Sequence, residues 1–125
     1  MITVIKSPFV QYKLTILRNK KTSNTVFRQT MNEISYLIAS DVLQYVPFKK
    51  QSIQTPLKKM SGTVLGQPII LVPILRAGLG LLEGFAKFLP EAEKGHIGLY
   101  RDEQTYEPVE YLFKLPRVKN KKVLI

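Results

Sequence analysis

The segment PILRAGLG, residues 73–80, carries the clearest chemical signal in the sequence. An apolar run leads to Arg76, and Gly78 and Gly80 follow where the pattern predicts a tight turn into a helix. A helix N-terminus offers free N–H groups and a positive dipole end to anions, and arginine adds a forked cation. Glycine lets the backbone approach a phosphate closely. The segment therefore predicts a phosphate or diphosphate site; the alternative is helix–sheet packing beside a surface arginine.

The segment LYRDE, residues 99–103, is the second candidate. Arg101 comes at the end of a predicted strand, and ligands in parallel α/β folds bind at the carboxyl ends of strands. We therefore expect Arg101 to face the same crevice as Arg76. The alternative is an ordinary surface ion pair of Arg101 with Asp102 or Glu103, which contributes little to stability.

Other catalytic chemistry is limited by composition. The sequence has no cysteine, which excludes disulfides, thiolate nucleophiles and cysteine-bound zinc. It has one histidine, His96, so a site with two histidine ligands is excluded, and we interpret His96 as structural. The glutamates at 103, 107 and 110 are more typical of a solvated face than of an acid–base pair.

The 125 residues, 45% hydrophobic and 22% charged, indicate one globular domain. The net charge is +10, of which +8 falls in residues 1–60 and +2 in residues 61–125. A basic protein attracts polyanions, but 14 of its 19 basic residues are lysines, which favours a solvated surface over a nucleic-acid patch. No apolar run approaches the roughly 20 residues that span a bilayer, and the opening has no signal-peptide pattern, so we expect a cytoplasmic protein.

The elements of the N-terminal half are predicted from periodicity. Residues 1–21 mix periods and form an extended arm or a short helix. Residues 23–46 predict a core-facing helix that Thr22 or Ser23 caps and that ends by Pro47. Its apolar positions recur at steps of three and four residues: Phe27, Met31, Ile34, Leu37, Ile38, Val42 and Tyr45. Residues 48–67 alternate weakly around Pro56 and predict an edge hairpin or irregular strands.

The C-terminal half reads as strands around one helix. PIILVPIL, residues 68–75, is almost entirely apolar and predicts a strand buried on both faces. A helix over 81–89 follows, then a long hairpin over about 95–115, and strand-like VLI at 123–125. Either this last segment is a short edge strand or, as we expect, the next βα unit is missing. The expected fold is α/β: an N-terminal arm over residues 1–21 and a partial core over 22–125.

Several of these segments closely resemble uracil phosphoribosyltransferases. They are VPILRAGLGLLEG (72–84), GHIGLYRDEQTYEPVEYLFKLP (95–116), VQYKLTILRNKKTSNTVFR (10–28) and EISYLIASDV (33–42). They cover almost the whole chain in the family's order. The resemblance implies a type I phosphoribosyltransferase fold, with a parallel sheet flanked by helices and a projecting β-hairpin arm.

The resemblance also implies an activity. The family joins uracil to 5-phosphoribosyl diphosphate in pyrimidine salvage, giving uridine monophosphate and diphosphate. By matching position, Arg76, Ala77, Gly78 and Arg101 are the implied phosphoribosyl diphosphate ligands. Mg²⁺ bound to the diphosphate is the implied cofactor, GTP an implied allosteric effector, and a homo-oligomer the implied assembly. No metal ligand in this chain is assigned.

The resemblance covers only the N-terminal portion of the family. There, a strand like KKVLI continues into an acidic residue and a Thr/Gly-rich loop that cradles the ribose 5-phosphate, and a later segment recognises uracil. We therefore expect a single, C-terminally incomplete domain that is inactive in isolation. The alternative is a non-catalytic remnant that acts as a basic dimerisation or RNA-binding module, although nucleic acid is not the expected partner.

Overall fold

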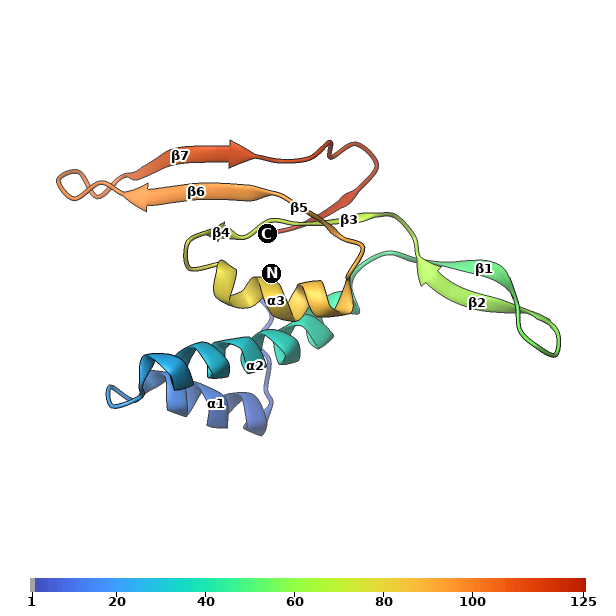
Figure 1. The fold of residues 1–125 in the computed structure, drawn as a ribbon, viewed down its shortest axis with the longest axis horizontal. Coiled ribbons are helices and arrows are strands. Elements are labelled where there is room, and N and C mark those ends of the chain that lie inside the picture. The colour runs from blue at the N-terminus through green and yellow to red at the C-terminus, as the bar shows by residue number, and fades with distance from the viewer. Residues whose placement is uncertain (1) are drawn as a thin grey trace.

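The computed structural model describes residues 2–125, which form a mixed α/β fold. The helices are α1 (Pro8–Arg18), α2 (Asn24–Leu43) and α3 (Leu79–Phe88). The strands are β1 (Phe48–Gln54), β2 (Lys59–Leu65), β3 (Ile69–Leu71), β4 (Ile74–Leu75), β5 (Glu93–Lys94), β6 (His96–Arg101), β7 (Pro108–Lys114) and β8 (Lys122–Leu124). In Figure 1 the helices stack on one side of the strands, with α3 nearest and α1 outermost. Because β3–β5, β3–β8 and β4–β6 pair in parallel, the expected α/β class is confirmed.

The N-terminal segment forms helix α1 rather than an extended arm. Ser7 is its N-cap, accepting a hydrogen bond from the Val10 backbone N–H at 3.4 Å, and Pro8 occupies the first turn, where its missing N–H costs nothing. Val10 is the buried residue that anchors α1. Thr22 does not cap the next helix. Its hydroxyl donates a hydrogen bond to the Ile16 carbonyl at 2.7 Å and so satisfies a free carbonyl at the end of α1.

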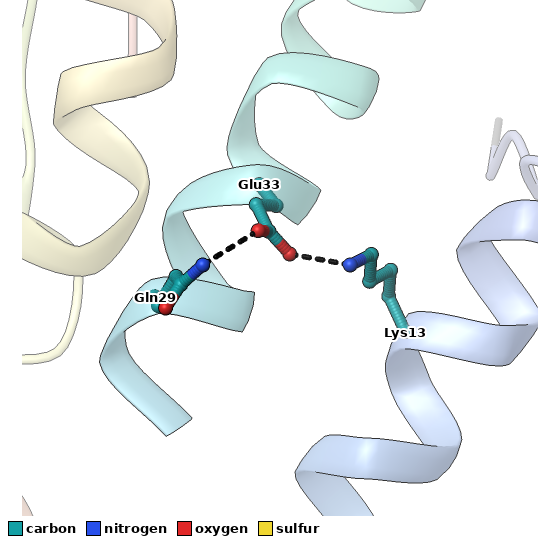
Figure 2. A network of polar contacts seen from close by, with 3 residues as sticks. All are labelled: Lys13, Gln29 and Glu33. Carbon is teal, nitrogen blue, oxygen red and sulfur yellow. Dashed lines mark hydrogen bonds and ion pairs between the residues drawn. The ribbon is translucent and has the colours of Figure 1, made fainter. Parts of the chain in front are cut away.

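A polar network joins α1 to α2 (Figure 2). The Lys13 ammonium lies 2.6 Å from a carboxylate oxygen of Glu33, which also accepts a hydrogen bond from the Gln29 amide at 3.2 Å. The same ammonium lies 5.3 Å from the ring centroid of Phe9 and 5.4 Å from that of Tyr12, within cation–π range. The hydrogen bonds from Lys13 and Gln29 hold the pKa of Glu33 below its ordinary value.

This lowered pKa predicts an acid-dependent loss of stability. Because folding favours the ionised Glu33, its contribution is complete at neutral pH and is lost as the pH falls through the lowered pKa. We expect the denaturation midpoint of Glu33→Gln to fall less between pH 7 and pH 3 than that of the unaltered chain. The difference is small because both side chains remain in partial contact with solvent, which screens the pair. Equal acid-induced shifts in urea titrations of the two proteins would contradict it.

Helices α2 and α3 cross at very close range. Ser35 of α2 is fully buried, and a Cβ built on Gly84 of α3 would stand 2.2 Å from the Ser35 hydroxyl oxygen. Three of the four buried residues of α2 are accordingly small, namely Thr30, Ser35 and Ala39, and the fourth is Ile34. The prediction that large apolar side chains of this helix face the core is wrong for Phe27, which is 43% exposed, and for Tyr45, which lies beyond the helix. The close crossing leaves room only for small side chains between the axes.

The expected hairpin over 48–67 forms a separate two-stranded sheet. Strands β1 and β2 pair antiparallel from Phe48↔Leu65 to Gln54↔Lys59, and every residue of β1 is exposed. Pro56 lies in the connecting turn, where its missing donor disrupts no ladder. Figure 1 shows this hairpin projecting to the right of the helices, away from the other strands.

The single strand predicted over 68–75 is wrong, because the chain divides there into β3 and β4. Residues 69–72 are buried as expected, but Ile74 is 43% exposed. Pro73 separates the two strands because it has no N–H to donate to a ladder. Strand β3 lies between β5 and β8, whereas β4 pairs with β6 in a different sheet, β4–β6–β7. The apolar cluster gathers around β3: Val46, Ile69, Leu71 and Leu89, with Leu82 and Phe85 of α3 packed against it.

The predicted hairpin over about 95–115 is present as β6 and β7. The two strands pair antiparallel from His96↔Lys114 to Arg101↔Pro108, with a register shift between Gly98 and Leu99. The C-terminal segment forms β8, which pairs in parallel with β3 at an edge of its sheet. Glu93 of β5 and Lys121, just before β8, form an ion pair beside this sheet.

Candidate functional site

The loop that carries Arg76 connects the end of β4 to the start of α3. Gly78 is the N-cap of α3, and its N–H donates to the Ile74 carbonyl at 2.8 Å, which closes a tight turn. The Leu79 N–H donates to the Arg76 carbonyl at 3.2 Å. Arg76 and Ala77 are exposed at the helix N-terminus, and the Leu75–Arg76 peptide bond is cis. The predicted sequence of strand, turn and helix N-terminus is therefore present, with the arginine at the turn.

The two glycines of this loop have different roles. A Cβ at Gly78 would stand 2.7 Å from the backbone N and O of Ile74, so this position excludes any side chain. Its φ of −60° is ordinary, and the requirement for glycine comes from close backbone packing rather than from an unusual backbone conformation. A Cβ at Gly80 would have Met31 as its nearest neighbour, at 3.7 Å, which is an ordinary contact. Glycine at position 78 thus serves packing within the turn, where the backbone of Pro73 and Ile74 lies too close for a side chain.

An open cavity of about 700 Å³ lies beside this loop. Its lining residues are Ile74, Leu75, Arg76, Ala77 and Gly78 on one side and Leu99, Tyr100 and Tyr111 on the other. The cavity therefore joins the α3 N-terminus to the β6–β7 hairpin. It combines a guanidinium, helix N-terminal backbone and two phenols, a set suited to an anionic, oxygen-rich ligand.

Sequence reasoning missed Tyr100 and Tyr111. Both are about half exposed, at 52% and 53%, and their ring centroids lie 6.2 Å apart. The two tyrosines themselves were the available signal, because an exposed tyrosine on a strand presents its hydroxyl to a neighbouring ligand. Alternation alone did not indicate which face of the hairpin these tyrosines occupy.

Arg101 is exposed at the end of β6, one residue beyond Tyr100, and does not line this cavity. Its alternative ion pairs are also not formed: within residues 2–125 the ion pairs are Lys13–Glu33 and Lys121–Glu93. Asp102 instead accepts hydrogen bonds from the backbone N–H groups of Thr105 (2.8 Å) and Gln104 (2.9 Å). These bonds order the hairpin turn and hold the pKa of Asp102 below its ordinary value. The role of Arg101 as a second diphosphate ligand remains a prediction.

The described part of the chain offers no metal centre of its own. No group of three or more His, Asp or Glu side chains in residues 2–125 gathers where it could hold a metal ion. His96 lies half-buried in β6 without such neighbours.

A second cavity, of about 390 Å³, lies between the base of the β1–β2 hairpin and the end of α3. Its walls are largely apolar, and it has neither an arginine nor a helix N-terminus.

Comparison with known proteins identifies the family. The family model described as uracil phosphoribosyltransferase matches residues 4–125. The chain belongs to the uracil phosphoribosyltransferase family. Curated uracil phosphoribosyltransferases from Lactiplantibacillus plantarum and Streptococcus salivarius are each 48% identical to it over 114 residues, which is 90% of this chain. The resemblance inferred from the motifs is thus confirmed.

The match covers one part of the uracil phosphoribosyltransferase relatives. The chain spans about half their length, 54% in both cases. A solved structure described as that of the AQ2163 protein from Aquifex aeolicus is 31% identical and superposes with a TM-score of 0.88. That alignment covers 98% of this chain and 60% of the other.

None of the helices in residues 2–125 is long and apolar enough to cross a membrane.

Proposed function

We propose that this chain carries the diphosphate half of a uracil phosphoribosyltransferase site, which forms uridine monophosphate and diphosphate from uracil and 5-phosphoribosyl diphosphate. The single observation that supports this most is the Arg76–Ala77–Gly78 loop, which lines a cavity at the N-terminus of α3. The reaction is inferred from family membership. The loop adds a guanidinium group, which suits the negatively charged diphosphate that leaves in this reaction.

The physical argument concerns the charge that develops during the reaction. Displacement at the ribose carbon leaves positive charge on the sugar and negative charge on the departing diphosphate. A guanidinium and oriented backbone N–H groups stabilise the leaving group best when they are fixed in place before the reaction. The tight turn closed by the Gly78 N–H, 2.8 Å from the Ile74 carbonyl, fixes the backbone next to Arg76 in this way. The reaction needs no covalent nucleophile from the protein.

Mg²⁺ is part of the proposal as a companion of the substrate. Residues 2–125 contain no group of three or more carboxylate or histidine side chains placed to hold a metal ion. Mg²⁺ commonly binds through the phosphates of a substrate, so the ion would enter bound to the oxygens of the diphosphate. The role proposed for Arg76 does not depend on this ion.

The assembly and the regulation of the protein are proposed from its family membership. We propose a cytoplasmic homo-oligomer that serves pyrimidine salvage, with GTP as effector on family grounds alone. Isolated two-stranded hairpins are marginally stable in water, and the exposed position of every β1 residue supports a role for the β1–β2 hairpin in self-association. The alternative of a basic RNA-binding module has less support. Helix α1 carries Lys13 and Arg18, and in Figure 1 it lies far from the β1–β2 hairpin, which carries Lys49, Lys50 and Lys59.

The test compares binding and turnover by residues 1–125. We expect the chain to bind inorganic diphosphate in calorimetry but to form no uridine monophosphate from uracil and phosphoribosyl diphosphate. Correct positioning of the reactants can lower a reaction barrier by roughly 7–11 kcal/mol. The chain spans only about half the length of its relatives, so we expect it to lack residues that position the substrates. Turnover near that of a full-length relative would contradict the expected inactivity, and absence of diphosphate binding would contradict the proposed site. Sedimentation of the same sample reports the oligomer.

A further inference from the structure

The β6–β7 hairpin contains a bulge that sequence alternation does not predict. Gly98 pairs with Leu112 and Leu99 pairs with Glu110, so Tyr111 has no register partner of its own. A bulge bends its strand and turns a side chain in a new direction, and bulges occur preferentially next to functional sites. Here the bulged residue is one of the two tyrosines that line the cavity beside Arg76.

Gly98 provides the seat for the Tyr111 ring. A Cβ built on Gly98 would stand 2.5 Å from Cζ and 2.6 Å from Cε2 of Tyr111, and 2.9 Å from Cβ of Leu112. The ring therefore lies directly across the glycine, in space that any other residue would fill. Tyr100 flanks it, at 6.2 Å between centroids and 41° between ring planes. Gly98 and Tyr100 together fix where the ring lies.

Tyr111 combines close contact with Gly98 and exposure to solvent. Tyr111 is 53% exposed, although its ring contacts a glycine backbone that is itself buried. Tyr111 lines the same cavity as Arg76, Ala77 and Gly78. The only polar atom of the side chain is the phenol oxygen, which donates one hydrogen bond at neutral pH.

We propose that Tyr111 is a substrate-positioning residue, whose hydroxyl donates a hydrogen bond to a diphosphate oxygen of the ligand held at Arg76. This inference rests on the proposed function, because it assumes that the diphosphate group occupies this cavity. A hydrogen bond to a charged acceptor is stronger than one between neutral groups. Gly98 acts through Tyr111, since its missing side chain allows the ring to reach this position.

The experiment measures the affinity of the 125-residue chain for inorganic diphosphate by calorimetry. We expect Tyr111→Phe to weaken binding about 10-fold, the lower range for loss of one hydrogen bond to a charged group. Phenylalanine keeps the ring on Gly98, so a packing role alone predicts no change in affinity. Tyr106→Phe is the matched control, because Tyr106 lies in the hairpin turn, 71% exposed and outside the cavity. Its affinity is expected to equal that of the unaltered chain.

Gly98→Ala tests whether the contact with Gly98 positions the Tyr111 ring. Its new Cβ would displace the ring, so we expect a loss of affinity at least as large as that of Tyr111→Phe. If both changes act through the same hydroxyl, the double variant binds no more weakly than Gly98→Ala alone. Additive losses would overturn the role assigned to Gly98. Circular dichroism establishes that each variant is folded, and Tyr111→Phe decides the proposal even if Gly98→Ala does not fold.

The outcomes separate this inference from the proposed function on which it rests. Diphosphate binding that Arg76→Ala abolishes and Tyr111→Phe leaves unchanged would overturn the role of Tyr111 and leave the site in place. Binding that is absent from the unaltered chain, or that Arg76→Ala does not weaken, would overturn both. A loss with Tyr111→Phe and Arg76→Ala, but not with Tyr106→Phe, is the result that the proposal requires.

Discussion

Replacing Arg76 with alanine is expected to weaken diphosphate binding by about 10- to 100-fold, the range for losing charge-assisted hydrogen bonds to an anion. Arg76 is the one charged residue that lines the cavity of about 700 Å³ within the described chain. Its removal would leave the phenols of Tyr100 and Tyr111 as the only side-chain donors that line this cavity. The measurement is a calorimetric titration with inorganic diphosphate at fixed ionic strength, because screening weakens exposed charges.

Two further variants identify the chemistry of the Arg76 effect. Arg117→Ala is the matched control: it removes the same charge from an exposed residue that lies outside the cavity, and we expect no loss beyond that from net charge. Arg76→Lys keeps the charge but not the planar fork, so we expect it to recover only part of the affinity. Equal losses with Arg76→Ala and Arg117→Ala would show that net charge, not this loop, holds the anion.

Gly84→Ala is expected to cause the largest loss of stability of any single methyl addition described here. The new Cβ would stand 2.2 Å from the Ser35 hydroxyl oxygen and 2.4 Å from its backbone carbonyl carbon. A side-chain rotation of Ser35 relieves only the first contact, so α2 and α3 must move apart. Overpacking of this kind costs about 1–3 kcal/mol or more, which exceeds the roughly 0.5–1 kcal/mol that alanine gains over glycine within a helix.

Gly80→Ala provides the matched control, since it adds the same methyl group to the same helix. Its nearest neighbour would be Met31 at 3.7 Å, so no element has to move. We expect Gly80→Ala to be neutral or slightly stabilising and Gly84→Ala to be clearly destabilising in urea titrations. If the two variants unfold at the same midpoint, the close crossing of α2 and α3 is not the constraint described here.

The parts of the fold that depend on local sequence were predicted well. The loop at Arg76 was predicted because an apolar run, an arginine and two glycines in eight residues determine a strand, a turn and a helix start locally. The two hairpins were predicted for the same reason. The break at Pro73 was not predicted, although proline cannot donate to a ladder, because the continuous apolar run dominated the interpretation.

The parts that depend on two segments at once were missed. Periodicity cannot tell which arc of α2 faces α3, because that choice depends on Gly84, about 50 residues away in the sequence. It also cannot locate a bulge, because the register of Tyr111 is a property of both strands. The relation of Arg101 to the cavity is a third case, since the direction of a residue at the end of a strand depends on how the hairpin curves.

The break at Pro73 also determines the order in which parts of the molecule open. Strand β3 lies between two partners and contributes to the apolar cluster, whereas β4 is two residues long, lies at an edge and pairs with β6. Segments with few buried contacts open locally at a lower free energy than the core. We therefore expect the Arg76 loop to open together with the β6–β7 hairpin while the core stays intact. By mass action, a bound anion would protect the hairpin amides from exchange and leave those of β3 unchanged.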